Sequence, residues 1–397
     1  MRYPSAAVAL ALLALAAPAP GAAGPSKYEA DLAAFLAEAD KTYPFLELKG
    51  IRADWAAAKP RLAAAAGACR SDTQFLGIVI EAIRCLRDAH MELVAPNVEM
   101  PKPPPRYYSG ISFLPATSGR VVVMFPPKGL GADLKTGAVV THIDGRDARA
   151  VLEGLARKSW ESGGFFSSPQ RARLFEYRLP LLGAKGEKHR LTVLDGARGR
   201  TVVLTSAVEA TGWPHAYNLP AGLVPVGRSF SYAPLPGGSG YMYIRRTDES
   251  AAPGITEALA RHPKAKGWIV DLRGNSGGGY DETLLSAVKA VPRPVAVLID
   301  AGCISAGETL ARDFAQYGGA RLFGSKTAGS SSAKAEWKFP SGIATVRFSV
   351  RSRWRADRKP IEFNGIDPDQ EVEAVPDEVA RGLNSDICRA EEYLRKP

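Results

Sequence analysis

The stretch of residues 295–314 limits what this chain can fold into more than any other part of the sequence. Residues 295–299 are a short run of apolar and β-branched side chains, which is typical of a buried strand. From Ser305 onward the spacing becomes helical, because Leu310 and Phe314 lie one helical turn apart. The stretch therefore predicts a strand that turns into a helix, with Ser305 at the junction.

The same alternation of strand and helix is present upstream of this stretch. Strands and helices are expected in turn at residues 241–244, 255–260, 268–272 and 282–291. Strands that alternate with helices form crossover units on a shared sheet, so we expect an α/β fold here. Residues 336–350 alternate in polarity around Ser341-Gly342, which predicts a β-hairpin after the α/β part.

The rest of the chain divides into regions of different pattern, and 397 residues are enough for several domains. Residues 25–98 carry apolar stripes at helical spacing, and a proline-rich linker follows at 101–105. Residues 106–207 are rich in strand patterns. We therefore expect a multidomain α/β protein in which residues 208–397 form the α/β domain and its β-rich C-terminal part.

Ser305 has two interpretations. A serine at the start of a helix lies beside backbone N–H groups that have no intrahelical partner and could hold a developing oxyanion. Ser305 and Glu308 also fit the capping box Ser-x-x-Glu, which needs no catalysis. Considered alone, this motif favours the cap.

Residues 1–24 predict a cleavable signal peptide, because one basic residue precedes an apolar run and then small residues at 17–23. We therefore expect a periplasmic or secreted protein. The later sequence holds no run of about 18 apolar residues, so no membrane span is expected.

Export permits disulfides. The four cysteines allow three complete pairings, and Cys69 with Cys85 is slightly favoured because both lie in the N-terminal helical region. Cys-x-x-Cys and His-x-x-x-His spacings do not occur, so we expect no metal site and no cofactor.

The formal net charge is +10 at pH 7. Basic residues are scattered apart from a local cluster at Arg347, Arg351, Arg353, Arg355 and Arg358. A nucleic-acid site would need such a cluster within a known binding module, so no nucleic-acid partner is expected. A solvated strand face, or contact with anionic envelope surfaces, explains the cluster better. The sequence sets no oligomeric state.

Residues 271–279 form a glycine-rich loop between an expected strand and helix. The loop lacks the Gly-Lys-Ser/Thr ending of a phosphate-binding loop and the Gly-x-Gly-x-x-Gly spacing. Its glycines let the backbone approach a bound group with N–H donors, as an oxyanion site requires. A tight turn without function is the alternative.

Residues 106–207 resemble a PDZ-like module. The markers, in order, are a glycine-containing opening strand, a short helix at 130–134, Lys135-Thr136-Gly137, and a strand ending in Ile143-Asp144-Gly145. The resemblance implies capture of a peptide's C-terminal carboxylate by backbone N–H groups of Gly110, Ile111 and Ser112. A small β domain without a ligand is the alternative.

Four blocks of the chain, together with the PDZ-like middle, resemble the C-terminal-processing, or tail-specific, serine peptidases and relatives such as the tricorn core protease. The blocks lie in the expected order at residues 86–90, 269–278, 305–308 and 360–369. The resemblance implies a ClpP/crotonase-like catalytic domain with Ser305 as nucleophile. It also implies an oxyanion hole made by the amide of Ala306 and that of Gly277 or Gly278.

The sequence departs from the Ser/Lys branch of this family at the position of the base. That branch carries a lysine in a Thr-x-Gly-Lys block, and the corresponding block here, residues 324–330, ends in Ser330. Lys334 is a rival base, although no motif places it. The usual Ser/Lys dyad is therefore not expected.

The tricorn-like branch uses a histidine from the N-terminal region and a glutamate from the last of the four blocks, residues 360–369, which we call the tail block. His90 and Glu362 occupy those places. A serine hydroxyl needs a base, and the base needs a partner that orients it. The serine that precedes the histidine in that branch is Ala89 here. Glu362, Asp88 and Ser330 are the candidates that would orient His90 directly.

These observations favour an exported serine peptidase that forms an acyl-enzyme at Ser305, with a peptide or protein as substrate. Two alternatives stay open: a catalytically degenerate peptide-binding protein on the same scaffold, and a hydrolase of acyl groups other than peptides.

Overall fold

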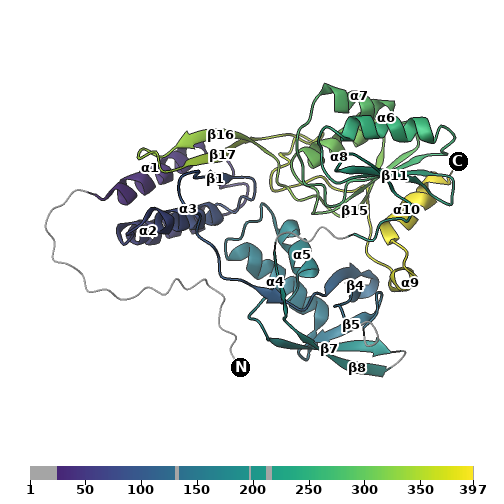
Figure 1. Ribbon diagram of the computed structural model, residues 1–397, viewed down its shortest axis with the longest axis horizontal. Coiled ribbons are helices and arrows are strands. Elements are labelled where there is room, and N and C mark those ends of the chain that lie inside the picture. The colour runs from purple at the N-terminus through teal and green to yellow at the C-terminus, as the bar shows by residue number, and fades with distance from the viewer. Residues whose placement is uncertain (1–24, 130–133, 196–197, 212–216, 397) are drawn as a thin grey trace.

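A computed structural model of the chain describes residues 25–129, 134–195, 198–211 and 217–396. The fold is mixed α/β, as expected. Figure 1 shows N-terminal helices beside a β-hairpin on the left, a sheet covered by helices on the upper right, and a smaller sheet with two helices below. Within the described ranges no helix is long and apolar enough to cross a membrane. The expected signal peptide lies outside the described residues.

The large sheet is mostly parallel. Its strands lie in the order β10 (Val224–Val226), β11 (Phe230–Pro234), β12 (Gly240–Ile244), β13 (Trp268–Asp271), β14 (Val295–Ile299), β15 (Arg321–Gly324) and β18 (Gln370–Glu371). The strands from β12 to β18 pair in parallel, and β10 and β11 add an antiparallel edge. Parallel neighbours need crossovers, and the first three are helices: α6 (Ala251–Arg261), α7 (Glu282–Ala290) and α8 (Ala306–Gln316). The predicted alternation of strands and helices is confirmed.

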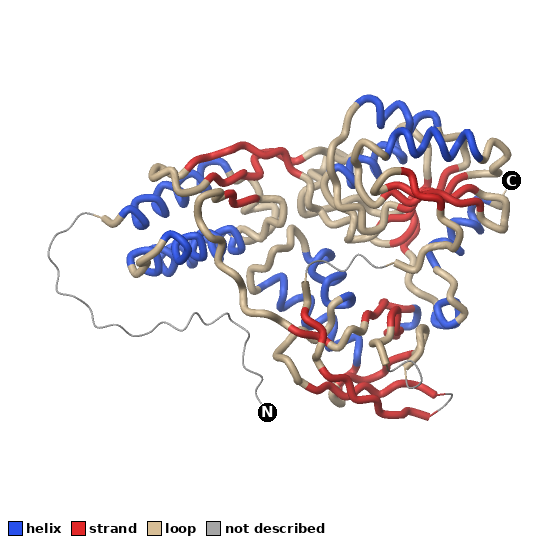
Figure 2. The backbone as a smooth tube through the Cα atoms, viewed as in Figure 1, coloured by secondary structure: helices blue, strands red, loops and turns tan. Residues whose placement is uncertain are grey.

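Both faces of this sheet are covered (Figure 2). Val295, Val297 and Ile299 of β14 belong to the core beneath α6, α7 and α8. Ala296 and Leu298 point to the opposite core, which α10 (Ser385–Leu394) covers. A strand buried on both faces has no polar side, and this explains the unbroken apolar run in the sequence.

The N-terminal helices pack against a hairpin from the far end of the chain. Helices α1 (Lys27–Thr42), α2 (Arg52–Gly67) and α3 (Asp72–Cys85) share one core with β1 (Glu92–Val94), β16 (Ser332–Lys338) and β17 (Thr345–Ser352). Phe35 lies at the centre, with its ring 5.3 Å from that of Phe348 and 6.0 Å from that of Phe339. The predicted hairpin is present, and it joins residues near 340 to residues near 35.

The smaller sheet carries the middle of the chain. Its order is β3 (Ser112–Ala116), β4 (Arg120–Phe125), β5 (Val139–Ile143), β7 (Lys188–Asp195) and β8 (Arg198–Thr205), with β6 (Arg146–Asp147) beside β5 and β2 (Tyr107–Tyr108) paired to β9 (Val208–Glu209). A short 3₁₀ turn, η1 (Thr117–Gly119), joins β3 to β4, and α9 (Pro376–Ala380) follows the bridge between Ala116 and Ala374.

Two helices accompany this sheet, α4 (Ala148–Glu161) and α5 (Pro169–Arg178). The pattern of residues 148–156 indicates a helix, and these residues lie within α4, whereas α5 was not predicted. Its start had readable signals, because Ser168 caps the N–H of Arg171 and Pro169 occupies the first turn. The short helix expected at 130–134 lies almost entirely outside the described residues.

The favoured disulfide between Cys69 and Cys85 was wrong. All four cysteines are free. Cys69 precedes α3 and Cys85 ends it, so the length of the helix, about 20 Å at 1.5 Å per residue, separates the two thiols. A disulfide requires Cα atoms within about 7 Å.

Replacing Phe35 by Ala tests how firmly the helices hold the hairpin. Phe35 is fully buried among aromatic rings, so Phe35→Ala should lower the free energy of unfolding by about 3–5 kcal/mol. Chemical denaturation followed by tryptophan fluorescence measures the loss. Phe165→Ala, at a half-exposed phenylalanine, is the control and should change stability by less than about 1 kcal/mol. Equal losses in both variants would contradict the packing described.

Candidate active site

Ser305 lies at the sharp turn between β14 and α8. Its backbone has φ 55° and ψ −123°, a conformation that side-chain-bearing residues rarely adopt and that costs about 1–3 kcal/mol. The turn is held by the Ser305 N–H, which lies 2.9 Å from the carbonyl of Ser330. Ser305 is half-buried. A strained serine at a strand-to-helix turn is also the arrangement of the nucleophile elbow in serine hydrolases.

Glu308 fixes this turn from inside. Its buried carboxylate accepts hydrogen bonds from Thr327 Oγ1 at 2.6 Å, from the N–H groups of Gly329 and Ser330 at 2.7 and 2.9 Å, and from the Ser305 N–H at 3.2 Å. Burial raises the pKa of the Glu308 carboxyl to about 7, against the hydrogen bonds that favour its charged form. The capping interpretation and the catalytic one are therefore compatible, because Glu308 binds the backbone of Ser305 and leaves the hydroxyl facing His90.

His90 follows α3 and meets Ser305 across 215 residues of sequence. Its Nε2 lies 3.0 Å from Ser305 Oγ, and its Nδ1 lies 2.9 Å from Ser332 Oγ. The backbone N–H of His90 donates to Asp88 Oδ1 at 2.8 Å, which fixes the turn that carries the ring. Burial, and then the positive charge of Lys334, lower the pKa of His90 from 6.5 to about 4. The imidazole is neutral at pH 7 and able to accept a proton.

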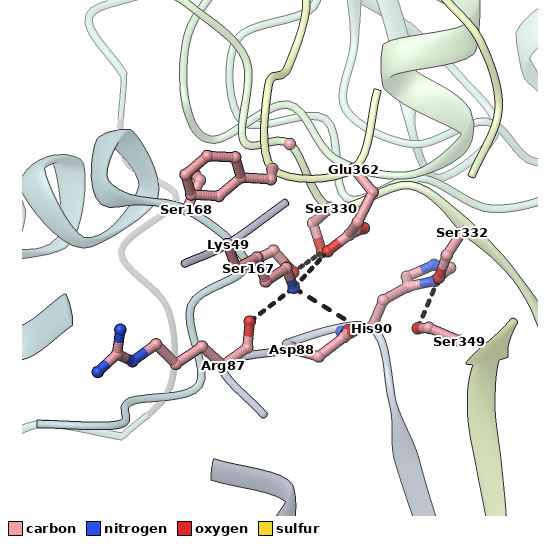
Figure 3. A network of polar contacts seen from close by, with 12 residues as sticks. Lys49, Arg87, Asp88, His90, Ser167, Ser168, Ser330, Ser332, Ser349 and Glu362 are labelled. Carbon is pink, nitrogen blue, oxygen red and sulfur yellow. Dashed lines mark hydrogen bonds and ion pairs between the residues drawn. The ribbon is translucent and has the colours of Figure 1, made fainter. Parts of the chain in front are cut away.

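Two serines that were not predicted from the sequence extend the hydrogen-bonded chain beyond His90. Ser332 Oγ donates to Ser349 Oγ at 2.7 Å, and these residues lie on the paired strands β16 and β17 (Figure 3). Burial opposes ionisation of Asp88, but the Lys49 ammonium, the His90 N–H and, to a smaller extent, the Ser349 hydroxyl hold its pKa below the usual value. The sequence carried no clear signal for this role, because Ser349 is one of several polar residues in β17 and its full burial is visible only in the structure.

Glu362 is fully buried, but the structure does not bring it to the imidazole. Its carboxylate accepts from Lys49 Nζ at 2.8 Å and from the Ser331 N–H at 2.9 Å. Lys49 also donates to Tyr43 Oη and to the carbonyl of Arg87. Burial raises the pKa of the Glu362 carboxyl, and the Lys49 ammonium opposes that rise.

Lys49 was not predicted from the sequence, where it is one lysine among many. Both its side chain and that of Asp88 are fully buried, with Nζ 3.8 Å from Asp88 Oδ2. Figure 3 shows Lys49 between Glu362 and the Arg87-Asp88 turn. One cation therefore ties the tail block to the turn that precedes His90.

The other candidate bases and orienting residues lie elsewhere. Ser330 is buried and its hydroxyl accepts from Ser167 Oγ at 3.1 Å, whereas the imidazole contacts among the described residues are to Ser305 and Ser332. Lys334 pairs with Glu92, and Lys326 pairs with Asp367 at the surface. None of these lysines is hydrogen-bonded to Ser305 in the part of the chain that the structure describes.

The glycine loop lies directly against Ser305. Gly277 has φ 74°, and a Cβ added to it would lie 2.8 Å from the Cβ of Ser305, so the approach requires glycine. The Gly277 N–H donates to Asn275 Oδ1 at 2.9 Å. The N–H groups of Gly278 and Ala306 have no hydrogen-bond acceptor among the described residues. Both residues line the same cavity as Ser305, of about 480 Å³, so these two N–H groups are available to an oxyanion.

The three residues expected to bind a peptide carboxylate open the smaller sheet. Gly110 has φ 85°, Ile111 is buried in the core of that sheet, and Ser112 Oγ donates to the carbonyl of Arg178. A second cavity, of about 680 Å³, lies between β3 and α5 on one side and the ends of β14 and β15 on the other. The structure does not place this group next to Ser305.

Comparison with known proteins relates this chain to a family of serine peptidases. Residues 281–372 match the profile of Peptidase family S41. The carboxy-terminal processing protease CtpA of Bacillus subtilis (strain 168) is 28% identical in an alignment that covers 35% of this chain and 35% of CtpA. The chain thus spans about a third of that curated relative.

Solved structures show a similar fold over most of the chain. Mature CPAF complexed with lactacystin is 13% identical and has a TM-score of 0.57. The superposition covers 93% of this chain and 96% of the CPAF chain. Uncomplexed mature CPAF has a TM-score of 0.58 with the same coverage. At this identity the likeness concerns the fold alone. The S41 match and the CtpA relative agree with the predicted class, a serine-type peptidase, over the part of the chain that they cover.

Removing the charge of Lys49 tests the buried cluster. Lys49→Met would leave the carboxylates of Glu362 and Asp88 buried without their cation, and should lower the free energy of unfolding at pH 7 by about 3–5 kcal/mol. Urea denaturation measures the loss. The double variant Lys49→Met/Glu362→Gln should recover part of it. Lys59→Met, at a surface pair with Asp40, is the control and should cost less than about 1 kcal/mol; an equally small loss in Lys49→Met would contradict the cluster.

Proposed function

We propose that this protein is an exported serine peptidase that cleaves peptide bonds through a Ser305 acyl-enzyme, with His90 as general base. The observation that carries the proposal is the 3.0 Å contact between His90 Nε2 and Ser305 Oγ, made by an imidazole that is neutral at pH 7. Proton transfer over such a contact is the step that activates a serine hydroxyl. Export rests on the signal-peptide pattern of residues 1–24.

In the proposed mechanism His90 Nε2 accepts the Ser305 proton as Oγ attacks the substrate carbonyl. The N–H groups of Gly278 and Ala306 donate to the resulting oxyanion. The imidazolium then gives its proton to the leaving amine, and the acyl-enzyme forms. Water, deprotonated by the same imidazole, attacks the acyl group and releases Ser305.

The proposed orienting partner of His90 is a pair of serines. Nδ1–H donates to Ser332, Ser332 donates to Ser349, and Ser349 acts on the Asp88 carboxylate. In this proposal the two serines, and not Glu362, orient the imidazole of His90. Glu362 instead forms an ion pair with Lys49. The arrangement favours the Ser/His branch of the family over the Ser/Lys branch.

The proposed domains follow the same resemblance. Residues 25–98 form the N-terminal helical region, 106–207 a PDZ-like domain, and 208–397 a ClpP/crotonase-like catalytic domain. The opening of β3 at Gly110, Ile111 and Ser112 would hold the end of a peptide beside the larger cavity.

Labelling with a fluorophosphonate probe tests the nucleophile and the base. Wild-type protein should be labelled, Ser305→Ala should not, and His90→Ala should be labelled at least about a thousandfold more slowly. Ser286→Ala, on the surface of α7, is the matched control and should keep the full rate. Undiminished labelling of Ser305→Ala would reject the assignment. Labelling without hydrolysis across a panel of peptides, but with hydrolysis of esters, would favour another acyl hydrolase.

The acid limb of the pH profile tests His90. The base must be neutral, and its pKa lies at about 4, so kcat/KM should fall as pH drops through about 4 instead of 6.5. Lys334→Gln removes a positive charge that lowers this pKa, and should move the acid limb to higher pH. Lys338→Gln, an exposed lysine on the same strand, should leave it in place. An inflection near 6.5 in wild-type protein would contradict the buried neutral imidazole.

A further inference from the structure

The cavity beside Ser305 is lined by positive charge. Its wall includes Ser305, Ala306 and Gly278 together with three arginines, Arg312, Arg351 and Arg353. The described residues that line it include no Asp or Glu. The volume of about 480 Å³ is in the range of cavities that bind small molecules or a few residues of a peptide.

Two of these arginines have no anionic partner. Arg312 is neutralised by Asp313, at 2.7 Å, whereas Arg351 and Arg353 make no ion pair with any described residue. Other arginines of the same basic cluster are paired: Arg347 with Glu92 and Glu336, and Arg355 with Asp357 and Asp367. Arg358, the remaining member of the cluster, also makes no ion pair with a described residue, but it lies outside the cavity, so the arginines without an anionic partner that line the cavity are Arg351 and Arg353.

The path of the chain explains why both charges reach this cavity. Arg351 and Arg353 are two residues apart at the end of β17, so their side chains leave an extended chain on the same side. Ser352 between them is buried, and its hydroxyl accepts from the Glu362 N–H at 2.9 Å. Arg351 pairs with Ala333, the neighbour of the Ser332 that contacts His90. The arginines are thus set on the strand pair that positions the base.

A buried hydroxyl in the same wall also lacks a partner. Thr309 on α8 lines the cavity and is 1% exposed, and its Oγ1 has no hydrogen-bond partner among the described residues. A buried hydroxyl left without a partner costs free energy that a bound ligand can recover. Tyr280 and Trp354 supply aromatic surface beside the arginines.

We propose that this cavity is a subsite for a substrate carboxylate, with Arg351 and Arg353 as the specificity-determining residues and Thr309 as a further donor. The carboxylate belongs either to an Asp or Glu side chain close to the scissile bond or to the C-terminus of the peptide. Arginine forms paired, charge-assisted hydrogen bonds to carboxylates, and the groups beside Ser305 place that recognition next to the reacting atoms. This inference rests on the proposed peptidase function and names its substrate class.

Internally quenched decapeptides test the subsite. One set carries Glu or Gln at each of six central positions and ends in an amide, and a second set carries Gln and ends in a free carboxylate. If the subsite binds a side chain, the wild-type enzyme should show kcat/KM about tenfold higher for Glu than for Gln at one position or more. If it binds the C-terminus, kcat/KM should instead be about tenfold higher for the free carboxylate than for the amide. Arg351→Gln/Arg353→Gln should abolish the preference, measured within that variant as the ratio of kcat/KM for the acidic peptide to kcat/KM for its neutral counterpart. Arg347→Gln, on the same strand but outside the cavity, should retain it.

Binding to Ser305→Ala separates this inference from the proposed function. Fluorescence anisotropy with the same peptides needs no catalysis, and acidic peptides should bind about tenfold more tightly than neutral ones. If wild-type protein cleaves no peptide but this binding difference is present, the peptidase assignment fails and the carboxylate subsite stands. Equal treatment of acidic and neutral peptides by both proteins overturns the subsite. A preference for acidic peptides that survives in the double variant also overturns the subsite. The charge-reversal variant Arg353→Glu should favour peptides that carry Lys, and an unchanged preference for acidic peptides in this variant would overturn the subsite as well.

Discussion

The contact between His90 and Ser305 is the constraint that the packing around it has to satisfy. Ser305 belongs to the large sheet and its helices, whereas His90 follows the N-terminal helices. The contact therefore requires both parts to be packed correctly. The strained turn after β14 exposes Ser305, and Glu308 holds that turn through hydrogen bonds to the backbone. His90 is carried by the turn after α3, whose helix is packed against β16 and β17 around Phe35. The packing of the N-terminal helices is therefore part of what brings His90 to Ser305.

The buried charges around Lys49 also help to position His90, and their burial costs free energy. Taking an ammonium and two carboxylates out of water is unfavourable, and mutual attraction offsets this only when the geometry is close. Here Lys49 reaches Glu362 at 2.8 Å and Asp88 at 3.8 Å, so it ties the tail block to the turn that carries His90. Glu362 thus helps to position the turn that carries His90 through Lys49, whereas the imidazole itself contacts Ser305 and Ser332.

The sequence allowed the local elements to be predicted, and some of the site. Strand β14, helix α8 and the glycine loop follow from short-range patterns, and each lies where residues 268–314 indicated. Ser305 and His90 were candidates because their residue types suit the chemistry. Ser332, Ser349 and Lys49 were missed, because their roles arise from contacts between segments far apart in the chain. The pairing of Cys69 with Cys85 failed for the same reason, since nearness in sequence said nothing about the helix between them.

The tautomer of His90, measured by ¹H–¹⁵N NMR of protein labelled at the imidazole nitrogens, tests the central claim most directly. We expect a neutral ring at pH 6 with its proton on Nδ1, held by Ser332, and with Nε2 free to accept the proton of Ser305. Ser332→Ala should then loosen this preference for one tautomer. A proton on Nε2 in the neutral ring, or a fully charged imidazolium at pH 6, would contradict His90 as the base for Ser305.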